Sequence, residues 1–469
     1  MKKGLLLLIV IWAQTVNADP RFFRFHLNND QSSIGAEVES QDFSKDDFFN
    51  QKLDHFSSSD QRTFRQRYFI DSSLVKTKSE SAPVIYYLCG ESTCGGATSS
   101  ELVNQIAKKY GAHRVALEHR YYGYSQPFKT LDSQNLVYLS MGQAIEDLAT
   151  FQKFATQTFG LKGKWISVGG SYPGEVSAFY RLKHPELVAG ALASSAPVLA
   201  KDNFEEYDHH VAKVAGPACL NAIQMAFTEV EGRLKTPASA RAVKKVFQAD
   251  LIQNNIDFLY VIADMASVAI QYGFQKTFCD QVIDGLSRGK VVESYAKVGL
   301  EIFNRFAITP VQDSFQGAES VDPNDYLGWA GMRSWMYQSC TEFGFYQIAY
   351  SNPAQSARSS QISLTYHNDV CRRLFGIQFP VDVRKTNAQY YRQLFSAGVK
   401  NILFTNGAND PWSTLSITEN NPDSGLNPGL QFFTIPGAAH CEDLGSRMSV
   451  YLDSARNQFD QLVGRWLSE

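Results

Sequence analysis

The sequence predicts an α/β protein in which a doubly wound, mostly parallel sheet is interrupted by a mostly helical insertion. Short apolar runs alternate with helical segments up to about residue 200 and again after about residue 382, which is typical of parallel strands with helices on both faces. Between these points strand signals are few and apolar residues recur at helical spacing. The 469 residues therefore suit one large fold that carries an insertion.

The composition excludes several classes of protein. Hydrophobic residues make up 44% of the chain and charged residues 19%, which excludes a largely disordered protein. The 44 Lys and Arg against 47 Asp and Glu give a net charge of -3. The chain has no excess of positive charge that would attract it to nucleic acid or to an anionic membrane. We therefore expect neither as a partner.

The first 18 residues have the features of a cleavable signal peptide: Lys2 and Lys3, an apolar run at residues 5–13, and a small-residue ending. The run is shorter than the roughly 20 residues that span a bilayer, which favours a signal peptide over a membrane anchor. Residues 19–45 are polar and aperiodic, and we interpret them as a flexible or processed segment. No later apolar run is long enough to span a membrane, so the mature protein is predicted to be secreted or lysosomal.

The first part of the sheet and its helices are predicted over residues 46–199. Strands are expected at residues 62–70, 82–88, 114–118, 165–168 and 188–193. Helices are expected at residues 100–110 and 141–159, and in a segment that ends near His184. Gly111 and Gly160 follow the first two helices in the position that favours a left-handed cap.

The insertion is predicted over residues 200–382 as a helical cap. Within it Val243, Val246 and Phe247 recur at helical spacing. Residues 383–469 are then expected to complete the sheet, with strands at 401–405 and 431–435 and an amphipathic helix at the end of the chain.

Seven cysteines fit an oxidising compartment in which disulfides form. Two pairs are preferred because each lies within one predicted helical region, and a third pair flanks a short loop; the sequence does not fix the connectivity. The preferred pairs are Cys219–Cys279 and Cys340–Cys371, the third candidate is Cys89–Cys94, and Cys441 is left over. The spacings match no zinc pattern, so we expect neither a metal site nor a cofactor.

The sharpest motif is the glycine-rich segment at residues 169–174, which contains Ser171 and lies between a predicted strand and a predicted helix. A nucleophilic serine occupies such a strained strand-to-helix turn in α/β-hydrolases, and small neighbours are needed because the backbone folds back on itself. Pro173 departs from the simple G-x-S-x-G pattern, but proline is tolerated at a helix start. The alternative is a Gly-Ser turn without a catalytic role.

A serine nucleophile needs a base and an acid, which in this fold follow in the order serine, acid, histidine. His440 is the candidate base because it follows the predicted strand at 431–435, and loops after strand carboxyl ends assemble the site of such a sheet. Asp410, in the loop after the preceding strand, is the candidate acid, although it could merely cap a turn. Asp443 is its rival, but we expect Asp443 to open the last helix, where the dipole favours an acid.

Acyl transfer also needs N–H donors for the oxyanion. We expect the backbone amide of Tyr172 to be one donor and the loop after the strand at 82–88, at Gly90, to supply the other. For Glu91 in the same loop, we slightly favour a structural role in a salt bridge. The alternative is that Glu91 binds the amino group of a substrate.

With these residues identified, the chain resembles the serine carboxypeptidase family that includes prolyl carboxypeptidase, dipeptidyl peptidase II and thymus-specific serine protease. The resemblance covers nearly everything after about residue 46 and is greatest to the thymus-specific branch. It is carried by residues 49–56, 63–69, 118–123, 169–172, 193–198, 337–346, 406–412 and 440–441.

The resemblance implies an α/β-hydrolase with a helical cap, and it places Ser171, Asp410 and His440 on the triad positions of the family. Members cleave peptides near a terminus, several of them after proline. Trp412 matches a residue near the pocket for the side chain before the cut, although it could be ordinary core. Three residues depart from those usual in the family and leave the post-proline preference open; they are Tyr124, Pro173 and Glu175.

We therefore predict a serine exopeptidase that acts on short peptides, either as a carboxypeptidase or as a dipeptidyl peptidase. An esterase or lipase with the same triad is the first alternative, and a non-enzymatic binding protein on the hydrolase fold is the second. A homodimer is one option for its assembly.

Overall fold

The computed structural model of the chain describes residues 45–76, 80–328 and 330–469. The predicted signal peptide at residues 1–18 and almost all of the predicted segment at 19–45 lie outside these ranges. Within the described ranges, no helix combines the length and the apolar character that a membrane span requires.

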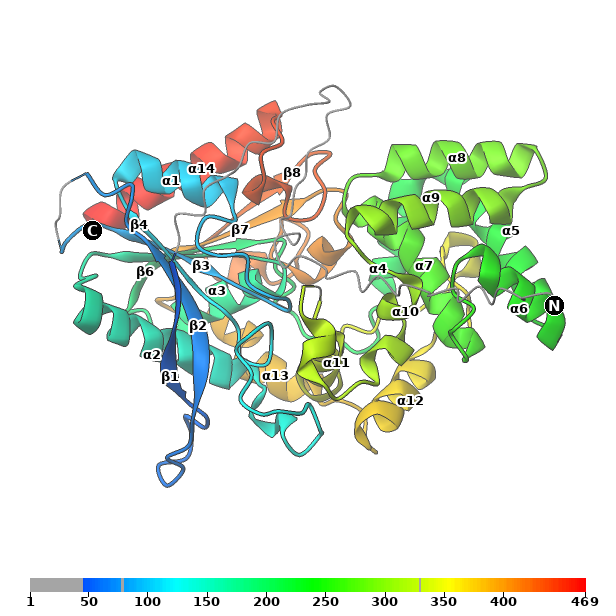
Figure 1. Cartoon of the computed structure of the whole chain (residues 1–469). Helices are drawn as coiled ribbons and strands as arrows, with labels where there is room; N and C mark the ends of the chain where they lie inside the picture. Colours follow the sequence, from blue (N-terminus) through cyan, green and yellow to red (C-terminus); the bar gives the residue numbers. More distant parts are fainter. Residues whose placement is uncertain (1–44, 77–79, 329) are drawn as a thin grey trace, which may run out of the picture.

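An eight-stranded sheet forms the centre of the molecule, with the order β1-β2-β4-β3-β5-β6-β7-β8 (Figure 1). The pairs β1–β2 and β2–β4 are antiparallel, whereas all other neighbours are parallel. This confirms the predicted doubly wound, mostly parallel sheet of an α/β-hydrolase. The strands are β1 (Lys45–Lys52), β2 (Thr63–Asp71), β3 (Val84–Leu88), β4 (His113–Leu117), β5 (Trp165–Gly170), β6 (Val188–Ser194), β7 (Ile402–Gly407) and β8 (Leu430–Ile435).

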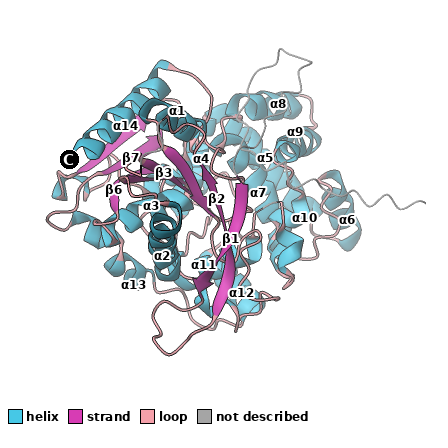
Figure 2. Ribbon diagram, turned by 60° about the vertical axis from the view of Figure 1, so that its left-hand side comes forward, coloured by secondary structure: helices cyan, strands magenta, loops and turns pink. Residues whose placement is uncertain are grey.

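Helices cover both faces of the sheet (Figure 2). On one face α1 (Glu101–Tyr110) and α14 (Val450–Ser468) pack on apolar side chains that alternate along the central strands, such as Ile166 and Leu192. On the other face α2 (Met141–Phe159) and α3 (Tyr172–Lys183) join the larger core, which continues into the cap. Burial of both faces explains why the central strands read as continuous apolar runs.

The segment between β6 and β7 is mostly helical and forms the cap at the right of Figure 1. Two disulfides fasten it: Cys219–Cys279 joins α5 to α8, and Cys340–Cys371 joins the turn after α11 to α12. Its helices are α4 (Glu205–Ala215), α5 (Pro217–Arg233), α6 (Pro237–Val246), α7 (Asn255–Gln271), α8 (Gln275–Ser287), α9 (Val291–Arg305), α10 (Pro310–Asp313), α11 (Met332–Gln338) and α12 (Leu364–Phe375). After the cap, α13 (Val383–Gln389) leads back toward β7.

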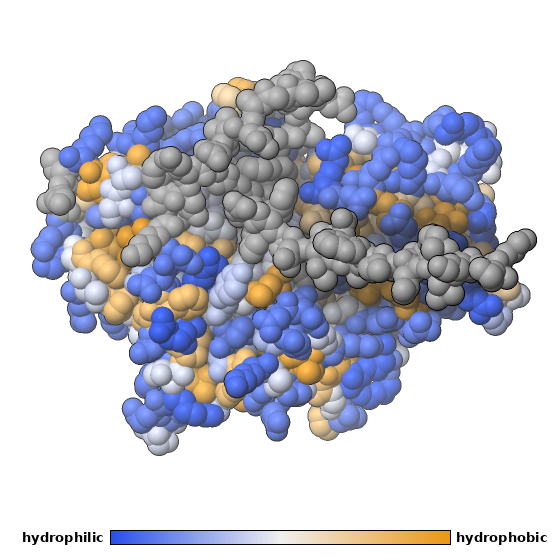
Figure 3. Space-filling view, viewed as in Figure 1, coloured by the Kyte–Doolittle hydropathy of each residue, from blue (hydrophilic) through white to orange (hydrophobic). Residues whose placement is uncertain are grey.

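A third disulfide, Cys89–Cys94, closes the loop after β3, and Cys441 is a free thiol. On the face drawn in Figure 3, the apolar side chains among the described residues gather in separate patches between hydrophilic ones. This view therefore offers no single continuous apolar area.

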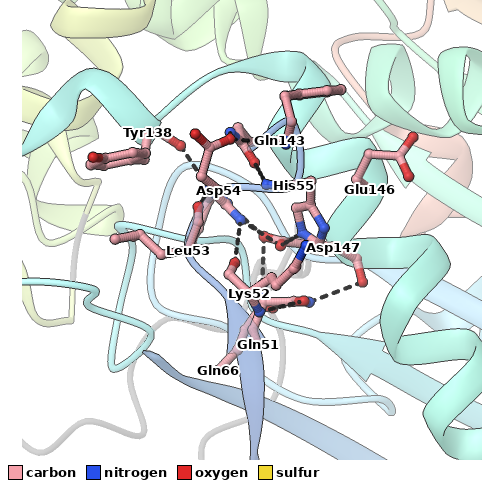
Figure 4. A network of polar contacts seen from close by, with 12 residues as sticks. Gln51, Lys52, Leu53, Asp54, His55, Gln66, Tyr138, Gln143, Glu146 and Asp147 are labelled. Atoms are coloured by element: carbon pink, nitrogen blue, oxygen red, sulfur yellow. Dashed lines mark hydrogen bonds and ion pairs between the residues drawn. The ribbon is translucent and has the colours of Figure 1, made fainter. Parts of the chain in front are cut away.

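A buried polar network joins the antiparallel edge of the sheet to α2 (Figure 4). Asp147 of α2 pairs with His55 at 2.8 Å and with the guanidinium of Arg120 at 2.6 Å. Gln51 of β1 donates a hydrogen bond to Gln66 of β2 at 2.9 Å. Burial raises the pKa of Asp147, but the charges and hydrogen bonds of Arg120 and His55 together outweigh burial and leave this pKa below its ordinary value. The carboxylate therefore stays ionised inside the protein.

Candidate active site

The turn between β5 and α3 has the geometry expected of a nucleophile turn. Ser171 follows the last residue of β5 and has a φ of 62°, a left-handed value that is strained for a residue with a side chain. A Cβ on Gly169 would lie 2.0 Å from the carbonyl oxygen of Pro173, so only glycine fits there. The amide of Ser171 donates to the carbonyl of Ser194 at 2.8 Å, which ties the turn to the end of β6.

His440 and Asp410 form a buried hydrogen-bonded pair in the loops after β8 and β7. His440 Nδ1 lies 2.8 Å from Asp410 Oδ2, and the two residues are 4% and 0% exposed. Burial lowers the pKa of His440, but the charge and hydrogen bond of Asp410 together with those of Cys441 outweigh burial, so this pKa stands well above its ordinary value. Asp410 also accepts the amide hydrogen of Trp412 at 3.0 Å, which fixes its carboxylate.

The loops that carry Ser171 and His440 meet at the same edge of the sheet. A Cβ on Gly170 would lie 2.9 Å from the sulfur of Cys441, so the residues next to the serine and next to the histidine are in contact. Within the described part of the chain, no hydrogen bond joins the Ser171 hydroxyl to His440. Such bonds are often long in enzymes without substrate and tighten when substrate binds.

Among the hydrogen bonds and ion pairs of the described residues, none joins the carboxylate of Asp443, the rival acid, to His440. The two carboxylate oxygens of Asp443 accept hydrogen bonds from Ser194 Oγ at 2.6 Å and from Thr405 Oγ1 at 2.7 Å. The expectation that Asp443 opens the last helix is wrong, because it lies in a short turn at Glu442–Leu444 and α14 begins at Val450. Buried hydroxyl donors at the ends of β6 and β7 hold this carboxylate in place.

Gln271, at the end of cap helix α7, contacts the loops that carry the candidate base and the candidate acid and was not identified from the sequence. Its backbone carbonyl accepts the amide hydrogen of His440 at 2.8 Å. Its side-chain oxygen accepts from Trp412 Nε1 at 2.9 Å and from the hydroxyl of Tyr207 at 2.6 Å. The cap therefore anchors the candidate base and a residue two positions after the candidate acid.

Tyr172, whose amide is a predicted oxyanion donor, is fixed by buried hydrogen bonds. Gln338 donates to the Tyr172 hydroxyl at 2.9 Å, and His119 Nε2 lies 2.9 Å from the same hydroxyl. Because His119 Nδ1 donates to the carbonyl of Arg120, Nε2 accepts the hydroxyl hydrogen of Tyr172. Burial lowers the pKa of His119 to about 4, which keeps its ring neutral for this role.

Gly90, the second predicted oxyanion donor, lies against the first turn of α3. A Cβ on Gly90 would come within 2.4 Å of the ring of Pro173, so this close approach requires glycine. The neighbouring Glu91 accepts the amide hydrogen of cap residue Gly331 at its backbone carbonyl. Burial raises the pKa of the Glu91 carboxyl, and the charge of His440 lowers it by a smaller amount. Glu91 forms no ion pair with another described residue, contrary to the favoured expectation of a salt bridge.

Trp412, in the loop that carries the candidate acid, packs in a group of aromatic rings from the cap. Its ring lies 5.5 Å from Phe345 and 5.4 Å from Tyr207. Tyr172 approaches the same group from α3, at 5.7 Å from Phe343. Among the described residues, no group of histidines, cysteines or carboxylates is arranged to hold a metal ion.

The chain is similar to known serine proteases along most of its length. Residues 51–457 match the sequence family described as serine carboxypeptidase S28. The chain is 37% identical to probable serine protease EDA2 of Arabidopsis thaliana over 78% of this chain and 74% of that protein. It is 32% identical to thymus-specific serine protease of Mus musculus, covering 99% and 97%. It is 26% identical to lysosomal Pro-X carboxypeptidase of Bos taurus, covering 90% and 88%.

Solved structures with low sequence identity also align. Proline iminopeptidase from Mycobacterium smegmatis aligns with a TM-score of 0.37 and 10% identity, covering 90% of this chain and 99% of that one. The acetyl esterase MekB aligns with a TM-score of 0.40 and 12% identity, covering 91% and 98%.

Proposed function

The chain belongs to the serine carboxypeptidase S28 family, and from this premise we propose that it is a serine exopeptidase that cleaves short peptides near one end. The observation that carries the proposal is the buried pair of His440 and Asp410, joined at 2.8 Å beside the strained Ser171 turn. Family membership supports serine peptidase chemistry; the roles of these three residues and the position of the cut are proposed here.

In the proposed mechanism Ser171 Oγ attacks the carbonyl carbon of the scissile peptide bond while His440 takes the hydroxyl proton. Asp410 holds the imidazole by its Nδ1 and stabilises the imidazolium that forms. The amides of Tyr172 and Gly90 donate to the oxyanion. His440 then gives the proton to the leaving amine, and water attacks the acyl-enzyme with His440 again as base, which regenerates the serine.

The covered position of the site favours short peptides as substrates. His440 is 4% exposed and its amide is held by the cap residue Gln271. A site enclosed between a sheet edge and a cap accepts a chain end more readily than a segment of a folded protein. We propose that this selects peptides with a nearby terminus, including peptides with proline before the cut.

We also propose that the protein works in the secretory pathway, either outside the cell or in the lysosome. Three disulfides among the described residues fit an oxidising compartment. Relatives that are named lysosomal Pro-X carboxypeptidases fit the second destination.

A panel of short peptides tests the proposal. The peptides are free or blocked at each end, carry proline or alanine before the cut, and are assayed from acidic to neutral pH beside matched esters. An exopeptidase should lose turnover when one end is blocked: the carboxyl end for a carboxypeptidase, the amino end for a dipeptidyl peptidase. Ester hydrolysis without any peptide cleavage would contradict the proposal and favour an esterase.

A further inference from the structure

Glu175 is a buried carboxyl group to which neither the fold nor the proposed triad gives a role. It lies in the first turns of α3, four residues after Ser171, and is 0% exposed. Neither of its carboxylate oxygens has a hydrogen-bond partner, and no ion pair among the described residues includes it. Buried polar groups are nearly always paired, because an unpaired one costs several kcal/mol. A group that the protein leaves unpaired is therefore a candidate for pairing with a ligand.

The position of Glu175 on α3 places it among aromatic side chains beside the nucleophile. Residues three and four apart share a helix face, so Glu175 lies between Tyr172 and Phe179. The ring of Tyr172 packs 5.6 Å from Trp335, and the ring of Phe179 packs 5.0 Å from Tyr390. Helical side chains lean toward the amino end of the helix, so the Glu175 carboxylate is directed toward the end that carries Ser171.

The charges around Glu175 are negative. Burial raises its pKa well above the ordinary value, and the carboxylates of Glu342 and Glu91 raise it further. The charges of the same three glutamates also raise the pKa of Tyr172, the residue that follows the candidate nucleophile. Glu342 is better compensated, because its carboxylate accepts the amide hydrogen of Met141 at 2.9 Å and the charge of Lys385 lowers its pKa. The protein thus gathers three acidic side chains here without supplying Glu175 with a cation.

We propose that the buried, unpaired carboxylate of Glu175 forms a subsite that binds a positively charged nitrogen of the peptide substrate. This inference rests on the proposed peptidase function and names the substrate class of the same site. A cation between aromatic rings and a buried carboxylate gains both a cation–π contact and a charge-assisted hydrogen bond.

The side chain of a lysine or arginine just before the cut is the source that the geometry favours. Glu175 lies one helical turn, about 6 Å along the axis, from Ser171. The long apolar stem of a basic side chain can cover this distance along the aromatic rings while its charged end reaches the carboxylate. The free α-ammonium of a short peptide has the same chemistry and is the second source.

Substrate pairs and the variant Glu175→Gln test the subsite. Peptides with free ends that differ only in lysine or norleucine before the cut measure the contribution of the side chain. The norleucine peptide with a free or an acetylated amino end measures the contribution of the α-ammonium. The control is Glu186→Gln, which changes a glutamate just beyond the end of α3 whose side chain is 63% exposed.

In the wild type we expect kcat/KM to be higher for the lysine peptide than for the norleucine peptide. Glu175→Gln should lower this ratio by about 30-fold or more, because a buried charge loses its partner, and Glu186→Gln should leave it unchanged. If only the preference for a free amino end falls in Glu175→Gln, the subsite binds the α-ammonium.

If neither ratio changes in Glu175→Gln, the inference is wrong and Glu175 is a protonated structural residue. Glu175→Met, which fills the site without a polar group, provides a second variant if Glu175→Gln does not fold. Labelling of Ser171 by a serine-directed phosphonate shows that each variant has an assembled site. A wild type that neither labels nor cleaves any peptide would instead refute the proposed function.

Discussion

Replacing Gln271 with leucine should weaken both the fold and the candidate active site, because one side-chain oxygen accepts hydrogen bonds from two buried donors. Gln271 Oε1 accepts from Trp412 Nε1 at 2.9 Å and from the Tyr207 hydroxyl at 2.6 Å. Leucine has a similar size but leaves both donors unpaired. Each buried donor without a partner costs about 1–3 kcal/mol. The free energy of unfolding should therefore fall by about 2–6 kcal/mol.

The same substitution should lower kcat more than it changes KM. Trp412 lies two residues after Asp410, so a loop that is no longer held at Trp412 lets the acid shift relative to His440. A displacement of about 1 Å can reduce the rate about 100-fold. Urea unfolding measures the stability, and steady-state kinetics on a cleaved peptide measure the rate.

Gln105→Leu is the matched control, because it makes the same change at an exposed position of α1. It should alter the free energy of unfolding by less than about 0.5 kcal/mol. If Gln271→Leu behaves like this control in both assays, the cap does not position the loops of Asp410 and His440 in the way described.

Two further substitutions test the buried charges. Asp410→Asn removes the charge that holds the pKa of His440 above its ordinary value. In a pH–rate profile the acidic limb of kcat/KM should then move to lower pH, while kcat falls about 10³–10⁴-fold; an unmoved limb would contradict the pairing. Asp147→Asn leaves the guanidinium of Arg120 buried without its counterion, which should lower the free energy of unfolding by about 3–5 kcal/mol. Urea unfolding measures this loss, and a loss below about 1 kcal/mol would show that the pair contributes little.

The parallel part of the sheet and its flanking helices could be predicted because their local signals agree. The helix expected at residues 141–159 is α2 with the same bounds. Ser140 caps its start through a hydrogen bond from the Gln143 amide, and Gly160 ends it at a φ of 69°. A serine before a helix and a glycine after it mark its two ends for local reasons that do not depend on the rest of the fold.

Strand β1 was not predicted, because its buried face does not look apolar. Phe49 and Gln51 both point into the protein, and Gln51 is 0% exposed. A buried glutamine is tolerated only because Gln66 and the carbonyl of Asp147 accept its hydrogens. A glutamine counts as polar in a sequence, and nothing local indicates that it will be buried. The alternation of buried apolar and exposed polar residues that is typical of a strand is therefore not visible at residues 45–52.

In the candidate site, the residues that follow strands could be predicted and those that come from the cap could not. Ser171, Asp410 and His440 each follow a parallel strand, and the carboxyl ends of such strands share one edge. Gln271 lies 141 residues before Trp412, and its contacts depend on how α7 packs against the loops of Asp410 and His440. A glutamine at the end of a cap helix carries no local signal of this role.

Labelling with a serine-directed phosphonate, followed by mass spectrometry of the modified peptide, tests the central claim most directly. In the processed wild-type protein the label should lie on Ser171 alone and should abolish peptide cleavage. Ser171→Ala should neither label nor cleave peptides, while its urea unfolding stays close to that of the wild type. Cleavage retained by Ser171→Ala, or a label on another serine, would contradict the account.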